Sequence, residues 1–381
     1  MAESTSRNLP VLITQPSELE KLVAQLRAES LVAVDTEANS LYAYQERVCL
    51  IQFSTQHGDF VVDTVELRQL ELLHEIFSDP HVEKVFHACE YDIICLKRDF
   101  GFTFANVFDT MVGARVLGWK RVGLGDLLAE KFGVKLDKKF QRANWGARPL
   151  DEELLAYARD DTHYLLALRD LEAEQLNHAG RLVEARESFE RFTLVEPPSR
   201  LFDPDRYISI DGARQLDPAG QGILRELFRW RETRAQAENK PPFKVLGNHV
   251  LLHLAQQRPT APEQLKSIHG LGEWGVRKYG KVILQMIERG KANPQHKPPW
   301  LRRHPDALDP AARDRLGKLR EWRKQRALAR NVEADVIVTN DVMQTIARRN
   351  PKTVEGLREA GLGDWKLREY GHEILDVLSR K

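Results

Sequence analysis

Residues 31–37, LVAVDTE, are an apolar run that contains two carboxylates, Asp35 and Glu37. Side chains at i and i+2 of a β-strand point to the same face of the sheet, so these two acids should project together. An unpaired carboxylate costs several kcal/mol to desolvate, and a strand that only built a core would exclude both. The run therefore predicts a strand beneath a site that binds a cation.

Two further acids and a tyrosine occur in comparable settings. Asp92 lies in HACEYDIICL, where it should open a helix, and Asp161 follows Tyr157 by four residues in YARDDTHYLLAL. We expect one helix over about residues 149–177, with Tyr157 and Asp161 on its buried side. Asp160 is turned roughly 100° away from that side, so we expect it to be a solvated acid beside Arg159.

Four acids and a phenol suit one type of chemistry. Mg²⁺ and Mn²⁺ take oxygen ligands, and two such ions about 3.5–4 Å apart can hold the attacking and leaving oxygens of a phosphoryl displacement. A nearby phenol can orient or deprotonate the attacking water. Any one of these residues alone is a weak signal. The ordered set of five indicates a two-metal phosphodiesterase site.

The N-terminal half alternates strand-like and helix-like segments. Four runs are rich in β-branched and apolar residues: PVLIT, LVAVDTE, RVCLIQFST and GDFVVD. Between the first two we expect an amphipathic helix, capped by Ser17 with Glu20 three positions on. Its apolar face holds Leu19, Leu22, Val23 and Leu26. This order predicts an α/β domain with a mixed sheet and helices on its faces.

The C-terminal half repeats itself. Trp230-Arg231 recurs as Trp322-Arg323 at a shift of 92 residues, and GLGEW at residues 270–274 recurs as GLGDW at 361–365. Two copies of one small helical bundle explain this pattern. The predicted organisation is a nuclease domain over residues 1–192, linkers over 193–214 and 293–308, and helical modules over 215–292 and 309–381.

Composition limits the remaining possibilities. Residues 1–200 carry 23 Lys and Arg against 33 Asp and Glu, whereas residues 201–381 carry 34 against 23, so formal charges of −10 and +11 underlie the net +1. A basic C-terminal half can neutralise phosphates. The chain has no run of about 18 apolar residues and no export signal at its start, so a cytoplasmic protein without a membrane span is expected. Three cysteines in apolar contexts should be buried thiols.

The motifs of the first half resemble the ribonuclease D family, the tyrosine-type branch of the DEDD 3′→5′ exonucleases. Four segments carry the resemblance, which covers about residues 10–178: VAVDTEANSLYAYQERVCLIQFST, VFHACEYDIICLKRDFG, VFDTMVGARVLG and LAYARDDTHYLL. It implies a ribonuclease H-like fold and two-metal hydrolysis that releases nucleoside 5′-monophosphates from a 3′ end. Each C-terminal copy resembles an HRDC domain, a helical bundle that commonly binds nucleic acid.

The resemblance also assigns residues. It implies that Asp35, Glu37, Asp92 and Asp161 hold two divalent ions, Mg²⁺ or Mn²⁺, and that Tyr157 positions the water. Possible substrate contacts are Thr36, Gln52, His87, Gln141, Trp145 and Arg148; for His87 a structural role is equally open. In FQRANWGARPL the chain has Ala143 and Asn144 where the family has a Ser-Asp pair, so contacts from those two positions are not implied.

Three functions remain to be compared. The first is an exoribonuclease that trims structured RNA, especially tRNA precursors, as a monomer whose basic modules hold the RNA. The second is a 3′→5′ DNA repair exonuclease, since similar motifs serve DNA enzymes. The third is an RNA-binding protein with an inactive nuclease fold, which the complete acidic set disfavours. No residue by itself indicates a contact to a ribose 2′-hydroxyl.

Overall fold

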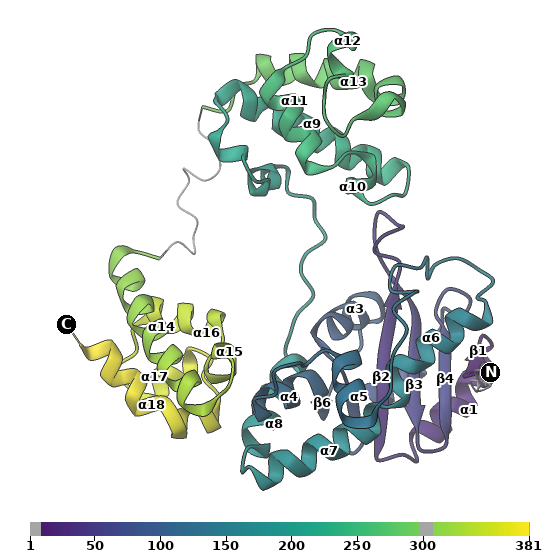
Figure 1. The fold of residues 1–381 in the computed structure, drawn as a ribbon, viewed down its shortest axis with the longest axis vertical. Helices are drawn as coiled ribbons and strands as arrows, with labels where there is room; N and C mark the ends of the chain where they lie inside the picture. Colours follow the sequence, from purple (N-terminus) through teal and green to yellow (C-terminus); the bar gives the residue numbers. More distant parts are fainter. Residues whose placement is uncertain (1–8, 297–307, 381) are drawn as a thin grey trace. The chain divides into compact units, whose positions relative to one another are not determined.

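The computed structural model describes residues 9–296 and 308–380 (Figure 1). The first residues of the chain and most of the predicted linker 293–308 therefore lie outside the described residues. The described chain forms two compact units. One contains residues 9–38, 48–197 and 308–380, and the other contains residues 39–47 and 198–296. Chain order and spatial grouping thus differ, because the last module belongs with the N-terminal domain.

The N-terminal domain is built on a six-stranded mixed sheet, as the sequence predicts. Its strands are β1 (Val11–Ile13), β2 (Leu31–Ala38), β3 (Val48–Thr55), β4 (Gly58–Asp63), β5 (Glu83–Phe86) and β6 (Val107–Asp109). Their order across the sheet is β1-β4-β3-β2-β5-β6. The β4–β3–β2 pairs are antiparallel, while β1 pairs with β4, β5 with β2 and β6 with β5 in parallel. The two short strands β5 and β6 were not among the predicted strands.

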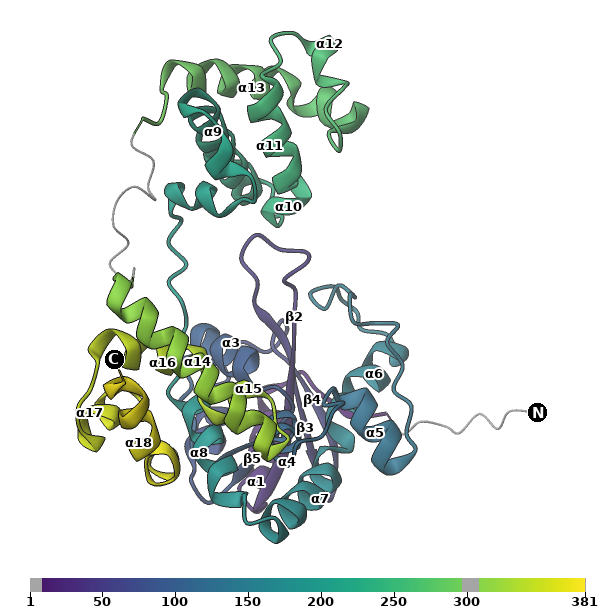
Figure 2. The same cartoon turned by 60° about the vertical axis from the view of Figure 1, so that its left-hand side comes forward.

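Helices cover both faces of this sheet. They are α1 (Pro16–Leu26), α2 (Leu72–Ser78), α3 (Glu90–Phe100), α4 (Thr110–Leu117), α5 (Leu124–Phe132), α6 (Glu152–His163), α7 (Leu165–His178) and α8 (Leu182–Thr193). Val32 and Val34 pack into the core that α1, α2 and α3 complete, whereas Ala33 packs with residues of α7 and α8. Both views show α3 and α6 on either side of β2 (Figures 1 and 2).

Helix α1 has the predicted buried face but a different cap. Leu19, Leu22, Val23 and Leu26 are all buried. The helix begins at Pro16, before the expected cap Ser17. The carboxylate of Glu18 accepts hydrogen bonds from the backbone N–H groups of Thr14 and Gln15, at 2.9 and 3.0 Å. Proline at the first helical position, which needs no N–H partner, moves the start of the helix two residues earlier than predicted.

The single helix expected over residues 149–177 is two helices. α6 ends at His163 and α7 begins at Leu165. Between them, the N–H of Tyr164 bonds to the carbonyl of Thr162 instead of continuing the α-helical pattern. The side chain of Thr162 bonds to Ser54 of the sheet at 2.7 Å, which holds the end of α6 against β3.

The first helical module forms its own core. Its elements are the 3₁₀ turns η1 (Pro204–Ser209) and η2 (Ala213–Gln215), followed by α9 (Pro218–Ala237), α10 (Pro242–Val245), α11 (Asn248–Gln257), α12 (Pro262–Leu265) and α13 (Gly272–Ala292). η1 lies within the expected linker 193–214 and η2 crosses its end, and Tyr207 of η1 is fully buried in the module's core. Residues 39–47, which connect β2 to β3, pack on this module. Tyr44 donates a hydrogen bond to Glu232 at 2.6 Å.

The second module repeats this bundle, which confirms the predicted duplication. It comprises α14 (Pro310–Arg330), α15 (Ala334–Ile337), α16 (Asn340–Arg349), α17 (Val354–Glu359) and α18 (Asp364–Ser379). It packs against α8 of the N-terminal domain. Val336 joins a cluster with Phe189, and Arg330 donates to both carboxylate oxygens of Glu184 at 2.8 and 2.5 Å.

Two compositional expectations can be compared with the structure. All three cysteines are free and buried, as predicted. Within the described residues, every helix is too short or too polar to span a bilayer.

Candidate active site

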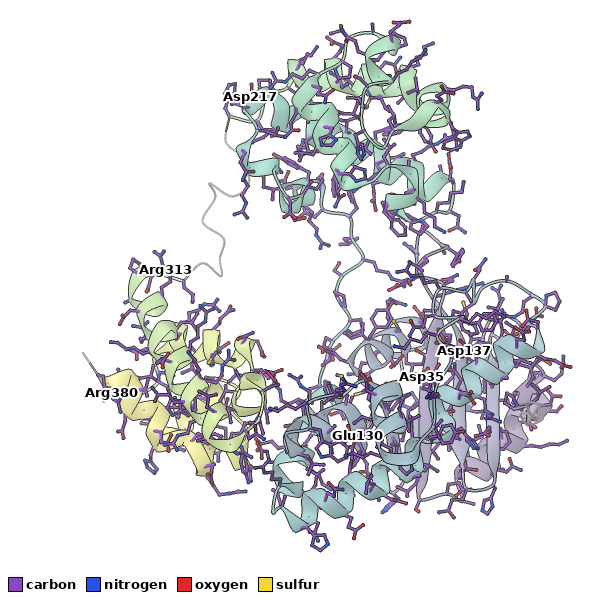
Figure 3. The ribbon with its side chains drawn as sticks, in the orientation of Figure 1. Asp35, Glu130, Asp137, Asp217, Arg313 and Arg380 are labelled. Carbon is purple, nitrogen blue, oxygen red and sulfur yellow. The ribbon has the colours of Figure 1, made fainter. Side chains whose placement is uncertain are left out.

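Three of the four predicted acids converge on one point. Asp35 and Glu37 lie on β2 and Asp161 lies on α6, and one carboxylate oxygen from each falls within 4.8 Å of the others. Figure 3 labels Asp35 on its strand. The i, i+2 spacing on β2 places the first two acids on the face that α6 covers, and Asp161 approaches them from that helix. All three remain partly exposed, so solvent reaches the cluster.

The fourth acid, Asp92, comes from α3 on the other face of the sheet. Thr36 lies between Asp35 and Glu37 and therefore points the opposite way. Its hydroxyl donates a hydrogen bond to the carboxylate of Asp92. Asp92 is buried in the first turn of α3, where the helix dipole favours a negative charge. Thr36 thus connects the two sides of the site around the end of β2.

The four carboxylates repel one another. Burial, followed by the charges of Asp92, Asp161 and Glu37, raises the pKa of Asp35 well above its usual value. Glu37 has a raised pKa for the same reasons, and burial is the main cause that raises the pKa of Asp92 and of Asp161 to about 7. Four close acids with raised pKa values form a site that a positive ion would stabilise.

Gln52 lies next to these acids without a hydrogen-bond partner. It faces Asp35 directly across the antiparallel β2–β3 pair, so both side chains lie on the same face. Gln52 is fully buried, and neither its amide nitrogen nor its amide oxygen bonds to any described residue. An unsatisfied buried amide is costly, so this side chain is poised to bond a ligand or water in the site.

Aromatic rings fix the position of Tyr157. The ring of Trp145 lies 5.9 Å from that of Tyr157, and the ring of Phe140 approaches its edge at the same distance. Burial, and then the charge of Asp161, raise the pKa of the Tyr157 hydroxyl. The phenol is therefore protonated at neutral pH. It can orient a water molecule by hydrogen bonding, and it is a poor base.

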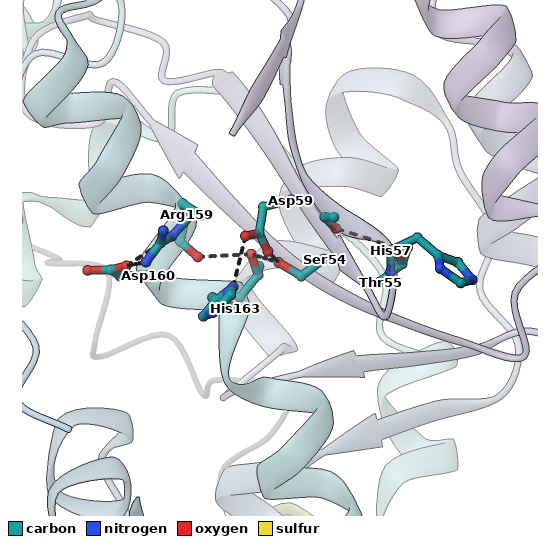
Figure 4. Close-up of polar contacts among 9 residues, drawn as sticks. Ser54, Thr55, His57, Asp59, Arg159, Asp160 and His163 are labelled. Atoms are coloured by element: carbon teal, nitrogen blue, oxygen red, sulfur yellow. Dashed lines mark hydrogen bonds and ion pairs between the residues drawn. The ribbon is translucent and has the colours of Figure 1, made fainter. Parts of the chain in front are cut away.

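A polar network anchors α6 to the β3–β4 hairpin (Figure 4). Asp59 accepts a hydrogen bond from Ser54 at 2.6 Å and contacts Nδ1 of His163 at 2.8 Å. Ser54 also bonds to Thr162, at 2.7 Å. These contacts hold the C-terminal turn of α6, and with it Asp161, against the sheet.

Asp160 does not behave as predicted. It was expected to be solvated, but only 8% of it is exposed. Its carboxylate is bound by the equally buried guanidinium of Arg159, at 2.6 Å (Figure 4). The charge of Asp160 also helps to raise the pKa of Asp161. The expectation failed because a helical wheel assumes solvent on the outer face of a helix, whereas this turn of α6 is covered.

The remaining candidate contacts have different surroundings. Trp145 is buried behind Tyr157. Arg148 binds both carboxylate oxygens of Asp63 at 2.5 Å. Both contacts suit residues that hold the site in place. His87 bonds to Thr110 at 2.9 Å, and burial lowers its pKa. Gln141 is exposed in the connection between α5 and α6, near the two positions that depart from the family pattern, and nothing in the structure brings it to the acids.

Asp109 is a supporting residue that the sequence analysis missed. It is fully buried at the end of β6, where its carboxylate accepts hydrogen bonds from the N–H groups of Val112 and Cys89 at 2.9 and 2.7 Å. The first bond caps α4, and the second fixes the backbone just before α3 and Asp92. An acid between an apolar strand and a helix, as in VFDTMV, is the N-cap pattern that could have indicated it.

Only oxygen ligands surround the centre of this site. Carboxylates with a nearby amide and phenol suit hard divalent cations such as Mg²⁺ or Mn²⁺, and the group lacks the thiolate or imidazole ligands that softer metals favour. Among the described residues, Asp35, Glu37 and Asp161 are the group of potential metal ligands with this close spacing. The arrangement is suited to metal-dependent hydrolysis of a phosphodiester.

Comparisons with known proteins also indicate a 3′-5′ exonuclease. The profile of the 3′-5′ exonuclease family matches residues 10–175, and the HRDC domain profile matches residues 220–287 and 312–378. Ribonuclease D of Gluconacetobacter diazotrophicus is 34% identical over 291 residues, which cover 75% of this chain and 73% of that protein. The crystal structure of the catalytic core of RRP6 from Trypanosoma brucei is 30% identical, has a TM-score of 0.68, and matches over 77% of this chain and 82% of that one.

Longer proteins also match. Protein RRP6-like 2 of Arabidopsis thaliana is 36% identical over 293 residues, or 72% of this chain. The chain spans only 34% of the length of that protein. The similarity to this longer relative therefore concerns only part of its length.

Proposed function

This chain belongs to the ribonuclease D family of 3′→5′ exonucleases, and we propose that it removes nucleoside 5′-monophosphates from the 3′ end of RNA. One observation supports the proposal: Asp35 and Glu37 of β2 and Asp161 of α6 bring carboxylate oxygens within 4.8 Å of one another, and α6 also carries Tyr157. Structured RNAs such as tRNA precursors are the proposed substrates. A cytoplasmic, monomeric protein remains our prediction from the sequence.

Members of this family use divalent metals, and the residues present fit two such ions. Asp35, Glu37, Asp92 and Asp161 would hold them. When bound, the ions would supply the positive charge that activates water and stabilises the departing 3′-oxygen. Because the ligands must be ionised and their pKa values are raised, metal binding at this site releases protons and strengthens as the pH rises through about 7.

The protein side chains would then orient the reactants. The protonated hydroxyl of Tyr157 would hydrogen-bond the attacking water, and the rings of Trp145 and Phe140 would hold the phenol in place. The unpartnered amide of Gln52 would bond a substrate or water oxygen. Positioning of this kind can account for several kcal/mol of a reaction barrier.

Matched RNA and DNA oligonucleotides of one sequence test the proposal. With Mg²⁺ or Mn²⁺ the protein should shorten the RNA from its 3′ end and release 5′-monophosphates, and excess chelator should stop the reaction. Faster degradation of the DNA would favour the alternative of a DNA repair exonuclease. Tight RNA binding without any hydrolysis would instead favour an inactive RNA-binding protein.

Replacing Tyr157 with phenylalanine should isolate the role of the phenol. Tyr157→Phe keeps the ring between Trp145 and Phe140, so stability and metal affinity should stay close to those of the unmodified protein. The turnover rate should fall by about ten- to a hundredfold, the effect of losing one hydrogen bond to a charged group. Single-turnover assays at saturating metal measure this. Tyr164→Phe, at the junction between α6 and α7, is the control, and equal rates for both variants would remove Tyr157 from the mechanism.

One face of the first helical module combines an exposed aromatic ring with several cations. Trp274, Arg277, Lys278 and Lys281 occupy positions i, i+3, i+4 and i+7 of α13, so they share one side of the helix. Trp274 is 54% exposed, and the ammonium of Lys278 lies 4.7 Å from the centre of its ring. Aromatic rings that stack on bases and cations that contact phosphates are typical of single-stranded nucleic-acid sites. We propose that this face holds RNA.

Neutralising two of these cations should weaken RNA binding in a salt-dependent way. Arg277 and Lys281 form no ion pair with any described residue, so Arg277→Gln/Lys281→Gln should leave the module folded. The slope of log affinity against log salt should become shallower by about 0.7–0.9 for each lost phosphate contact. Fluorescence anisotropy at several salt concentrations measures this slope. Lys21→Gln/Arg68→Gln, in the nuclease domain, is the control with the same charge change, and an equal slope for both double variants would contradict the assignment.

A further inference from the structure

A cavity separates the N-terminal domain from the second module within the unit that they form together. Its volume is about 360 Å³, and it is lined from one side by Glu90 of α3 and residues of α4 and α8, and from the other by residues of α15, α16 and α18. Charged groups on its wall include Arg115, Arg191, Asp335, Asp341 and Lys366. Several valines and Phe192 complete the wall. A volume of this size is in the range of small-ligand sites.

Most of the charges in this wall are paired. Arg115 binds both carboxylate oxygens of Asp335, at 2.5 and 2.6 Å. Arg191 bonds to Asp341 at 3.0 Å and to Thr339 at 2.9 Å. These pairs join α4 and α8 to the second module. Asp335 and Asp341 therefore each have an arginine partner.

Lys366 is the buried exception, whereas Glu90 at the start of α3 is exposed. Only 5% of this residue is exposed, yet its ammonium forms no hydrogen bond or ion pair with any described residue. The nearest acids in its surroundings have other partners. Glu184 is bound by Arg330, and Glu187 accepts hydrogen bonds from the backbone N–H groups of Trp365 and Lys366, at 2.5 and 3.4 Å.

An unpaired buried ammonium is energetically unfavourable. An ammonium carries three donors and no acceptor, and burying it without partners costs more than burying a neutral polar group. Desolvation is the main cause that lowers the pKa of Lys366. A ligand that supplied negatively charged oxygen atoms inside the cavity would give Lys366 its missing partner.

We infer that this cavity binds a phosphate monoester, with Lys366 as its principal ligand. The valines and Phe192 provide apolar surface for an organic group attached to the phosphate. Because its walls come from α8 and α18, an occupant would hold the second module to the nuclease domain. The inference does not depend on the proposed exonuclease activity.

Ligand binding to the full-length protein in excess chelator tests this site. Without metal, the four acids of the active site repel phosphate, so binding under these conditions reports on the cavity. Inorganic phosphate and adenosine 5′-monophosphate are titrated separately by calorimetry and by thermal unfolding. Both should bind and raise the Tm, and tighter binding of the nucleotide would show that the apolar wall contributes.

Variants at Lys366 separate a ligand site from an inert buried lysine. Lys366→Met should lower phosphate affinity by about tenfold or more, as expected for loss of a charge-assisted hydrogen bond. Without ligand its Tm should equal or exceed that of the unmodified protein, because a buried unpaired charge has been removed. Lys366→Arg keeps the charge and should retain binding. Arg368→Met, at an exposed position of the same helix, is the control and should bind normally.

Two results would overturn the inference. One is the absence of binding of both phosphate and the nucleotide to the unmodified protein in chelator. The other is equal affinity of the unmodified protein and Lys366→Met, or of Lys366→Gln should the methionine variant fail to fold. Either result would leave Lys366 as a structural residue of the module contact.

Discussion

Asp161→Ala lowers the rate of RNA hydrolysis by about 10²–10³-fold or more, the effect expected when a key electrostatic group leaves an active site. The side chain is one of the three acids whose oxygens lie within 4.8 Å of one another, so its loss removes a ligand from the metal site. Initial rates with a 3′-labelled RNA at saturating Mg²⁺ measure the effect. An Asp161→Ala protein that degraded RNA at nearly the normal rate would exclude this residue from the site.

The same variant should not be less stable in chelator. The folded-state pKa of Asp161 is raised to about 7, compared with an ordinary value of 3.8, so the folded protein binds this proton more tightly than the unfolded chain does. Between about pH 4 and pH 7 the unfavourable contribution of this acid grows, and above pH 7 it is fully present. Removing the acid should therefore stabilise the metal-free protein at pH 8 and have little effect near pH 4.

The choice of control follows from the structure. Asp160→Ala is unsuitable, because it would leave the buried guanidinium of Arg159 without its carboxylate partner. Glu152 is an exposed acid in the first turn of the same helix. Glu152→Ala should leave both the rate and the stability close to normal.

Glu184→Ala lowers the free energy of unfolding by about 3–5 kcal/mol, the cost of leaving one member of a buried ion pair without its partner. Glu184 on α8 is fully buried, and Arg330 of the second module donates to both of its oxygens. Arg330 also donates to the hydroxyl of Tyr370 at 2.6 Å, so its guanidinium is fixed in this place. Urea unfolding should show the loss, together with faster proteolysis of residues 308–380.

A surface ion pair provides the comparison. Glu355 and Arg358 lie 2.5 Å apart on α17, and more than half of each side chain is exposed. Glu355→Ala should cost less than about 1 kcal/mol, as is usual for solvated pairs. If the Glu184 and Glu355 variants unfolded at the same urea concentration, the contact between α8 and the second module would not contribute to stability.

Long segments could be predicted from the sequence, whereas most short ones could not; the three-residue strand β1 was predicted through the apolar run PVLIT. The apolar run in LVAVDTE and the apolar face of α1 identified β2 and α1 correctly, because each holds several apolar residues in a recognisable pattern. β5 and β6 have four and three residues, too few for a period to be seen. The break between α6 and α7 was missed because it depends on a bond from Thr162 to the sheet.

Some residues of the candidate site could likewise be predicted from the sequence, and others could not. Local spacing was enough to pair Asp35 with Glu37 and Tyr157 with Asp161. The burial of Asp160 depends on how α6 lies against other elements, and the position of Gln52 depends on the register of β2 with β3. The spacing of residues within one segment does not show how separate elements pack. The candidate metal ligands could therefore be predicted from the sequence, whereas the residues that surround and position them mostly could not.

The grouping of the second module with the nuclease domain bears on how the protein melts. The sequence suggests a catalytic half and a dispensable basic half, but residues 308–380 share buried contacts with α8, whereas residues 198–296 have a separate core. Cooperativity should follow these contacts. The C-terminal module should therefore melt in one calorimetric transition with the nuclease domain, and the module that precedes it in the chain should melt in another. A protein shortened after residue 197 has lost part of the cooperative unit that contains the nuclease domain, in addition to the module of residues 198–296.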